Sequence, residues 1–335
     1  EISCSLVGSE MCIRDRVSIP ILIAIIAIDY ELLIKIAPIL YGIITLLLAG
    51  VLFTTPINGA TSWYNIGAVS FQPAELAKIV IILSLTYTIV KIQARGKKEI
   101  NVIYKLAIIL GVAMVPVLLI IKQPDYGTAI AFIMALIFML FVAGIDKKYI
   151  IIAIAVVIVA VPLLYFFILP EHAKTRIDVY LNPNLDPRGA GYNIIQSKLA
   201  IGAGQLFGMG LLKGNQTQLG FLYPKTTDFI FSVIGEELGF IFAAGIIVLY
   251  VVLITKAIYV AKTAKDLEGS YIAAGIAGIF FFHMLENIGM TMGLLPITGI
   301  PLPFVSYGGS SLLSNIIMIG ILSVSYTHLR AHETA

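Results

Sequence analysis

The chain has 335 residues, of which 59% are hydrophobic and 12% charged, and its mean hydropathy is +0.99. Soluble domains carry charge on about a quarter of their residues, so this composition excludes an ordinary water-soluble fold. The net charge of +3, from 22 basic and 19 acidic residues, is too even to indicate nucleic-acid binding.

The two ends of the chain differ from its body. Residues 1–16 are polar, mixed in charge and without the pattern of a signal peptide, and residues 325–335 follow an apolar segment just as abruptly. We expect both ends to be non-native tails and residues 17–324 to form one polytopic domain. Both cysteines lie in the first tail, which excludes a disulfide framework in the body.

Apolar runs follow one another along the chain. Their lengths predict helices, because backbone polar groups in lipid must be paired within the segment. The first run has 12 residues, whereas a span needs roughly 20, so we expect a helix whose first part is missing. The fold class predicted is an all-α polytopic membrane protein with about nine transmembrane helices. The runs are 17–28, 36–53, 75–93, 105–121, 126–144, 149–168, 229–255, 271–292 and 304–324.

Basic residues gather in alternate connections between these runs. One set of short connections holds eleven Lys and Arg residues, and the opposite set holds only Lys122. By the positive-inside rule the first set is cytoplasmic. The eleven residues are Lys35, Lys91, Arg95, Lys97, Lys98, Lys105, Lys147, Lys148, Lys256, Lys262 and Lys265.

The connection 169–228 then lies outside the cell. A connection this long is more often functional than passive. Part of it predicts an interfacial or re-entrant helix. The apolar face of that helix would consist of Ile194, Ile195, Leu199 and Ile201.

Ionisable groups at membrane depth are functional candidates. Glu75 and Lys78 share a helix face, either as an internal ion pair beside the interface residue Trp63 or as functional groups. Asp125 stands at an outer helix entrance, where helix capping is the simpler explanation. Asp228 ends the outer connection, either as a helix cap or as a carboxylate that accepts a proton at the water–lipid boundary.

Three further polar features lie deeper in the chain. Glu236 and Glu237 fall within a run, where a carboxylate must be paired or protonated. His283 and Glu286 are three residues apart, and this spacing favours an interhelical hydrogen bond over a metal site. The segment GLLPITGIPLPFVSYGGSS breaks helix periodicity, so it must line a cavity or be buried in protein.

Together, these segments resemble the SEDS family of bacterial cell-wall proteins (RodA, FtsW and SpoVE). In order they are WYNIGAVSFQPAELAK, QPDYGTA, NPNLDPRGAGYNIIQSKLAIGAGQLFGMGLLKGNQTQLGFL, TTDFIFSVIGEELGF and NIGMTMGLLPITGIPLPFVSYGGSS. The parts NIIQSKLAIGAG and NQTQLGFL are more similar to RodA than to FtsW. Family members have ten spans, so the resemblance implies that the first helix and part of the second are absent.

The resemblance implies a peptidoglycan glycosyltransferase that polymerises lipid II on the outer face of the cytoplasmic membrane during elongation. The family's essential aspartate falls on Asp228, which is the expected catalytic residue. YPKTT precedes it where many relatives have LPExHT, which puts an auxiliary role for a neighbouring His or Glu in doubt. The expected substrate-binding or supporting residues are Trp63, Gln72, Glu75, Lys78, Asp125, Glu236, Glu237, Ser306, Gly308 and Gly309.

The implied reaction releases a lipid pyrophosphate, whose charge needs a cation. Lys78, a basic residue of the outer loop, or Mg²⁺ or Mn²⁺ could supply it. The implied partners are a class B penicillin-binding protein with transpeptidase activity and other membrane proteins of the elongation complex. The alternatives are a flippase for the same precursor, a non-catalytic scaffold, and a division or sporulation member of the family. Polar groups concentrated on the outer side favour polymerisation over transport.

Overall fold

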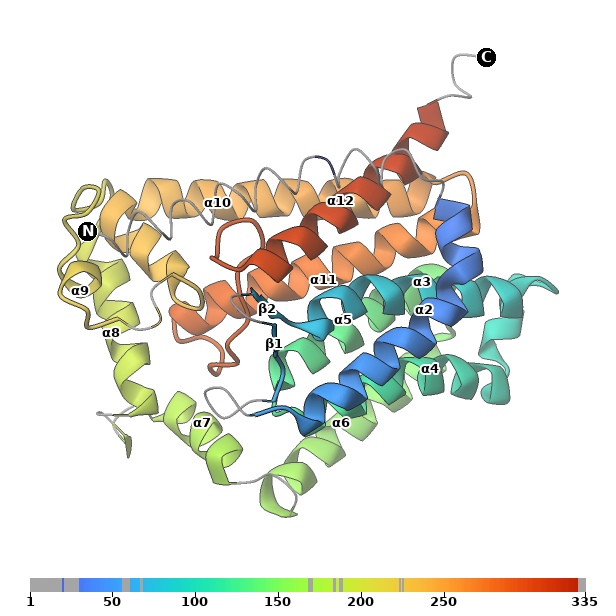
Figure 1. Ribbon diagram of the computed structural model, residues 1–335, viewed down its shortest axis with the longest axis horizontal. Helices are drawn as coiled ribbons and strands as arrows, with labels where there is room; N and C mark the ends of the chain where they lie inside the picture. Colours follow the sequence, from blue (N-terminus) through green and yellow to red (C-terminus); the bar gives the residue numbers. More distant parts are fainter. Residues whose placement is uncertain are drawn as a thin grey trace. The chain divides into compact units, whose positions relative to one another are not determined.

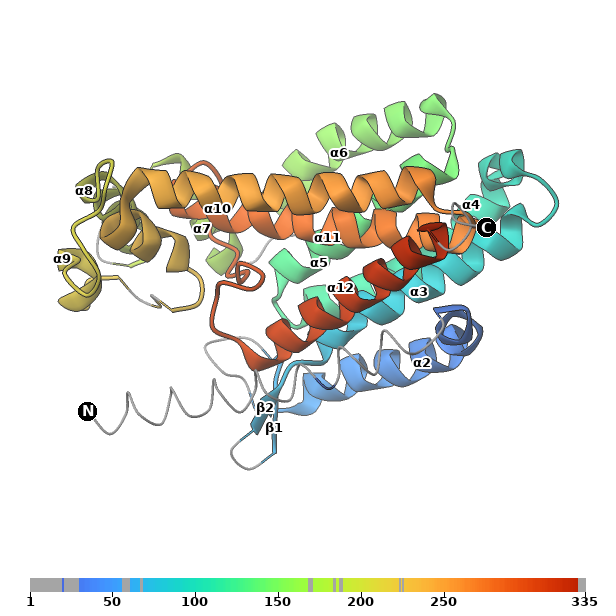
Figure 2. The same ribbon diagram turned by 90° about the horizontal axis from the view of Figure 1, so that it is seen from above.

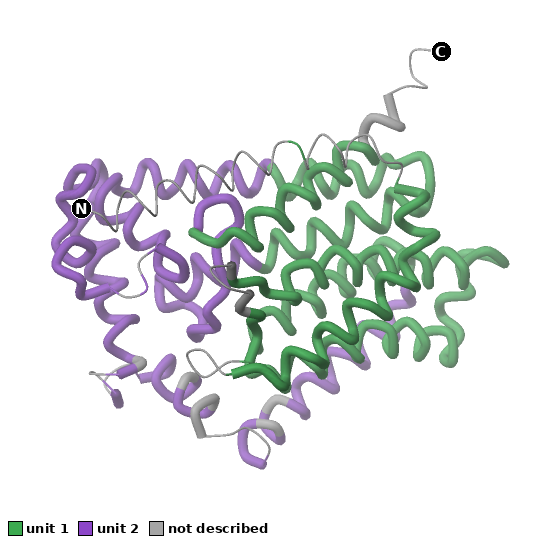
Figure 3. Tube along the Cα trace, viewed as in Figure 1, with its two compact units in different colours: residues 1–144, 253–282, 307–335 green, residues 145–252, 283–306 purple. Residues whose placement is uncertain are grey.

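The computed structural model describes residues 20, 30–55, 61–66, 69–167, 171–182, 185–186, 189–222, 224 and 226–330. The first predicted run, 17–28, lies outside these residues except for residue 20, and so does the tail 1–16. The chain divides into two compact units (Figure 3). Unit 1 consists of residues 1–144, 253–282 and 307–335, and unit 2 consists of residues 145–252 and 283–306.

Helices correspond to eight of the nine predicted apolar runs. They are α2 (Tyr30–Gly50), α3 (Pro73–Gln93), α4 (Ile103–Lys122), α5 (Tyr126–Ala143), α6 (Lys147–Phe167), α10 (Ile230–Thr263), α11 (Leu267–Thr291) and α12 (Gly309–Arg330) (Figure 1). Within the described part of the chain, six helices are long and apolar enough to cross a membrane. These are α2 with the short 3-10 helix η1 (Val51–Phe53), α4, α5, α6, α10 and α11. The predicted all-α polytopic membrane fold is confirmed. The helix α12 continues to Arg330, into the segment 325–335 that the sequence sets apart.

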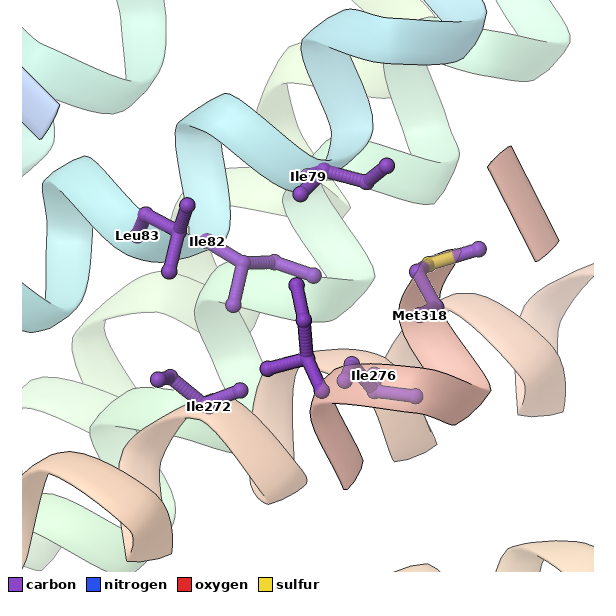
Figure 4. Close-up of a pocket in the computed structure, with 7 residues that line it drawn as sticks. Ile79, Ile82, Leu83, Ile272, Ile276 and Met318 are labelled. Carbon is purple, nitrogen blue, oxygen red and sulfur yellow. The ribbon is translucent and has the colours of Figure 1, made fainter. Parts of the chain in front are cut away.

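The helix α3 forms the centre of unit 1. It contacts α2, α4, α5 and α12, and 14 of its 21 residues are buried (Figures 1 and 2). Pro73 starts it at a position where the missing N–H costs nothing. Toward α11 and α12, α3 presents isoleucine and leucine side chains that form a wholly apolar lining (Figure 4). The lining contains Ile79, Ile82, Leu83, Ile272, Ile276, Met318 and Ile321, so this contact serves packing rather than chemistry.

Hydrogen bonds gather the helix ends of unit 1 into two groups. At one end, Gln93 of α3 donates from Nε2 to the Ala143 carbonyl at 2.8 Å and accepts from the Tyr271 hydroxyl of α11. At the other end, Gln123 after α4 donates to the Leu48 carbonyl of α2 at 2.9 Å. The first group lies next to the connections rich in Lys and Arg. These connections therefore meet at one end of unit 1, as the charge count predicted. Which side of the membrane this end faces stays a prediction.

A short β-hairpin, which the sequence did not predict, leads into α3. Its strands β1 (Tyr64–Ile66) and β2 (Val69–Phe71) are antiparallel, with Tyr64 opposite Phe71 (Figure 2). A 3-10 turn, η2 (Lys97–Asn101), follows α3 at the other end. The hairpin places Trp63 before its first strand and Gln72 directly at the start of α3.

The long connection 169–228 in unit 2, predicted to lie outside the cell, is folded. It contains α7 (Glu171–Leu181), α8 (Ala190–Ala203) and the one-turn helix α9 (Asn215–Gln218) (Figure 1). Ser197 of α8 donates to the Thr291 carbonyl of α11 at 2.6 Å and lies 2.6 Å from the Ser232 hydroxyl of α10. The helix α8 is therefore tied to the ends of two long helices.

Only part of the predicted apolar face of α8 is buried within the protein. Ile194 is buried, whereas Leu199 is 52% exposed. The buried positions of α8 are Gly191, Ile194, Ser197 and Ala200, followed by Gly204 after the helix. Small residues at this helical spacing let the backbones approach closely, so the contact face is set by residue size more than by hydrophobicity.

Within unit 2, α10 is interrupted at Gly239, whose backbone has φ 80° and ψ −176°. The segment 205–210 pairs with the broken backbone on both sides. Phe240 N–H donates to the Gln205 carbonyl at 2.8 Å, and Met209 N–H donates to the Glu236 carbonyl at 2.9 Å. A Cβ atom on Gly239 would lie 2.2 Å from the Gly208 nitrogen, so glycine is required at this crossing. The sequence predicted one uninterrupted helix here, and that prediction is wrong.

Candidate functional site

A buried ion pair lies at the start of α3 in unit 1. Lys78 Nζ is 2.7 Å from Glu75 Oε2, and both side chains are almost wholly shielded from solvent. The Ser314 hydroxyl of α12 donates to the same Glu75 oxygen at 2.7 Å. The ammonium of Lys78 thus neutralises Glu75. Both residues lie where the sequence predicted an ion pair.

Asp125 lies beside this pair within unit 1. Its Oδ1 accepts the Thr128 N–H at 3.1 Å, which confirms that Asp125 caps α5. Its Oδ2 accepts from Gln72 Nε2 at 3.2 Å, so the residue that starts α3 is joined to the residue that starts α5. Burial raises the pKa of Asp125 above its ordinary value, and the hydrogen bonds from Thr128 act in the opposite direction.

The remaining candidates of unit 1 lie on its periphery. Trp63 is half-buried, and Gly308 and Gly309 form the start of α12, two turns or less before Ser314. Unit 1 therefore brings together Gln72, Glu75, Lys78 and Asp125, with Ser314 as a fifth member. Ser314 was not predicted, because a serine within an apolar helix is common.

Asp228 belongs to unit 2 and is half-buried. Because α10 begins at Ile230, Asp228 lies in the turn that leads into this helix. The site where a Cβ atom would stand on Gly299 is 3.5 Å from Asp228 Oδ2, so the carboxylate lies against the irregular segment after α11.

Two side chains hold the turn that carries Asp228. Asn287 of α11 donates from Nδ2 to the Asp228 carbonyl at 3.0 Å and to the Ile300 carbonyl at 2.8 Å. Ser306 donates to the Thr227 carbonyl at 2.7 Å. The predicted site residues Asp228 and Ser306 are thereby brought together. Asn287 was missed, because an asparagine in a long apolar helix carries no motif of its own.

Glu236 and Glu237 organise the outer connection of unit 2. Glu236 accepts the backbone N–H groups of Gln216 at 2.7 Å and Thr217 at 3.0 Å, and so satisfies the start of α9. Glu237 accepts the Leu212 N–H at 3.0 Å. The sequence predicted that these carboxylates must be paired or protonated, and both are paired. Their partners are backbone N–H groups and the side chains of Thr217 and Gln218.

His283 and Glu286 also reach a loop rather than another helix. His283 Nδ1 lies 3.1 Å from the Pro301 carbonyl, and the Thr298 hydroxyl donates to Glu286 Oε1 at 2.8 Å. The predicted interhelical bond is therefore wrong in its partner, because the irregular segment 293–306 packs back against α11. Side chains of α11 thereby provide hydrogen-bond partners for backbone carbonyls of the irregular segment, those of Ile300 and Pro301.

No cluster of three or more His, Cys, Asp or Glu side chains suited to a metal ion exists among the described residues. The chain's own residues there do not fit a protein-only metal site. A divalent ion delivered with a substrate pyrophosphate stays a prediction.

The long apolar helices and the polar clusters at their ends define an all-α polytopic membrane protein. Residues 11–331 match the FtsW, RodA and SpoVE family of cell cycle proteins. The chain belongs to this family.

Relatives with curated names support this placement. The peptidoglycan glycosyltransferase MrdB of Escherichia coli (strain K12) is 40% identical over 293 residues, which cover 87% of this chain and 78% of that protein. The peptidoglycan glycosyltransferase RodA of Treponema pallidum is 32% identical over 352 residues, with coverages of 84% and 80%. The probable peptidoglycan glycosyltransferase FtsW of Trichlorobacter lovleyi is 40% identical over 271 residues, with coverages of 79% and 68%.

Solved structures share the fold. A chain from a study of polymerization and crosslinking by a peptidoglycan synthase complex superposes with a TM-score of 0.83 at 27% identity. That match covers 96% of this chain and 90% of the other. The crystal structure of Thermus thermophilus RodA gives a TM-score of 0.68 at 26% identity, with coverages of 94% and 87%.

Proposed function

We infer that this chain polymerises lipid II, the lipid-linked disaccharide-pentapeptide, and that Asp228 is its general base. The chain is a peptidoglycan glycosyltransferase, as its relatives MrdB and RodA are named. The observation that carries the role of Asp228 is its position. It is a half-buried carboxylate on the turn before α10, and the side chains of Asn287 and Ser306 hold that turn.

The chemistry requires one displacement. The acceptor sugar hydroxyl attacks the anomeric carbon of the donor, the new glycosidic bond forms, and the bond from that carbon to the pyrophosphate oxygen breaks. The hydroxyl proton passes to the Asp228 carboxylate, since a sugar hydroxyl is a poor nucleophile until a base accepts its proton. A single displacement inverts the anomeric carbon, so no second nucleophilic carboxylate is needed.

The pyrophosphate needs a positive partner, and Lys78 is engaged with Glu75. Lys198 of α8 is an exposed cation of the outer connection, and its side chain lies against Gly293 at the end of α11. We assign Lys198 as the candidate that neutralises pyrophosphate charge within unit 2. Removing the Lys198 charge is expected to raise the KM for lipid II more than it lowers kcat.

Transport of the same precursor is the alternative from another class. Broken helices mark substrate sites in many transporters, and α10 is broken at Gly239. Here, however, backbone groups on both sides of the break pair with residues 205–210. Because these backbone groups are already hydrogen-bonded within the protein, they are not available to a transported substrate, and this favours the polymerase.

The site is proposed to face the outside of the cytoplasmic membrane, where the sugars of lipid II are exposed. Elongation is the proposed role, with a class B penicillin-binding protein as partner, because the chain is similar to RodA and to a component of a peptidoglycan synthase complex. Co-purification of such a transpeptidase, and faster polymer formation in its presence, would support this role.

The test is incubation of the purified chain in detergent with fluorescent lipid II, followed by gel separation of the products. Glycan polymer that lysozyme digests is the expected result. Detergent removes the two compartments that transport requires, so a chain that binds lipid II but forms no polymer would contradict the proposal.

A further inference from the structure

The outer end of α11 carries an amide that the reaction above does not use. Asn287 is 0% exposed, and its Nδ2 joins two segments by donating to the carbonyls of Asp228 and Ile300. Its Oδ1 has no hydrogen-bond partner among the described residues. A buried acceptor without a partner is unfavourable, so stability alone does not explain an amide here.

The hydroxyl of Ser306 holds the residue before Asp228. It donates to the Thr227 carbonyl and accepts the Leu302 N–H, both at 2.7 Å. The carbonyls of Thr227 and Asp228 are thus held by side chains from two different segments. These carbonyls belong to the two peptide planes that flank the Asp228 Cα atom. Fixing both planes restricts φ and ψ of Asp228, and with them the direction of its Cα–Cβ bond.

The carboxylate itself meets the same irregular segment. Gly299 lies between Thr298, which donates to Glu286, and Ile300, which accepts from Asn287. Asp228 Oδ2 lies 3.5 Å from the place of a Cβ atom on Gly299. The segment 293–306 is in turn held to α11 by His283, Glu286 and Asn287. The turn with Asp228 and the segment beneath its carboxylate therefore share one support.

We propose that Asn287 and Ser306 are positioning residues that orient the Asp228 carboxylate toward the acceptor hydroxyl. The proposal rests on the proposed function, in which Asp228 accepts the proton. Proton transfer demands close placement of the base, and a misplacement of about 1 Å can lower a rate by about 10²-fold. Both residues act on the rate through Asp228 and need not touch the substrate.

The test compares Asn287→Leu with a matched control in the lipid II polymerisation assay. Leucine keeps the branched shape and removes the amide. Gln93→Leu is the control, because Gln93 is also buried and donates to two carbonyls, those of Lys97 at 3.0 Å and Ala143 at 2.8 Å. Both variants are expected to lose melting temperature. Only Asn287→Leu is expected to lose kcat, by about tenfold or more, with KM within about twofold of the parent.

A double-mutant cycle separates positioning from a general structural effect. If Asn287 acts through Asp228, adding Asn287→Leu to Asp228→Asn should leave the residual kcat unchanged. An equal proportional fall in both backgrounds, or parental kcat for Asn287→Leu alone, would overturn the proposal. Should Asn287→Leu fail to fold, Ser306→Ala carries the same cycle, since Ser306 is only half-buried.

Failure of the proposed function would be seen separately. Asp228→Asn with parental kcat would refute the base itself, whatever Asn287→Leu does. Asp228→Asn with low kcat and an additive Asn287→Leu would keep the base and refute the positioning role.

Discussion

At the residue scale, the ion pair of Glu75 and Lys78 is the most deeply shielded salt bridge among the described residues. Lys78→Ala removes the cation that neutralises the buried Glu75 carboxylate, so the free energy of unfolding should fall by about 3–5 kcal/mol. Thermal or denaturant unfolding in detergent measures this. The control is Glu75→Leu combined with Lys78→Met, which removes both charges and should regain most of the loss. A Lys78→Ala variant as stable as the parent would contradict the stabilising role of this ion pair.

Asp125 gives a dependence on pH. Its raised pKa means that the folded chain keeps a proton that the unfolded chain has lost, so its contribution is complete below the unfolded value of about 3.9 and is lost as the pH rises. Asp125→Asn stays neutral and can still accept the Thr128 N–H. The melting temperature of the variant minus that of the parent should therefore increase from about pH 4 to about pH 7. A constant difference would show that burial does not perturb Asp125.

At the scale of elements, unit 2 depends on a crossing of two backbones at glycine positions. Gly208 has φ 80°, and a Cβ atom there would lie 2.2 Å from the Glu237 carbonyl oxygen. Gly208→Ala should lower stability and expose the outer connection to protease, because both the conformation and the contact oppose a side chain. Gly220→Ala is the matched control, since Gly220 has φ 79° with nothing within 4 Å. Equal losses of stability in the two variants would mean that the close contact at the crossing does not contribute to stability.

At the scale of the whole molecule, the direction of the chain through the membrane rests on the charge count. In a background with Cys4 and Cys12 replaced by serine, Lys97→Cys should be protected from an impermeant thiol reagent in intact cells. Leu219→Cys, on the exposed end of the outer connection, should be labelled. The reverse pattern would place Asp228 on the cytoplasmic side.

The lengths of the apolar runs and the alternation of basic connections between them predicted most of the fold. They located the eight long helices, with ends that differ from the predicted runs by up to eight residues, because lipid leaves a spanning backbone few alternatives. They missed the break at Gly239, since a glycine inside an apolar run has the same composition with or without a break. They also could not pair Asn287 with Asp228, which lies 59 residues away, because that contact depends on the packing of the segment 293–306.

The same contrast holds for the site. The motif around Asp228 and the spacing of Glu75 and Lys78 were visible as residue patterns, and the ion pair formed as its spacing predicted. The roles of Glu236 and Glu237 were not, because their partners are backbone N–H groups of a loop whose path no local pattern specifies.

The central claim is that the Asp228 carboxylate accepts the proton of the attacking hydroxyl. The most direct measurement is the initial rate of lipid II polymerisation by purified Asp228→Asn and by the parent, with lipid II binding and melting temperature determined on the same samples. Asparagine keeps the shape but cannot take the proton, so the rate should fall by about 10²-fold or more while binding and melting temperature stay near the parent. An Asp228→Asn chain that binds lipid II and polymerises it at the parental rate would contradict the account.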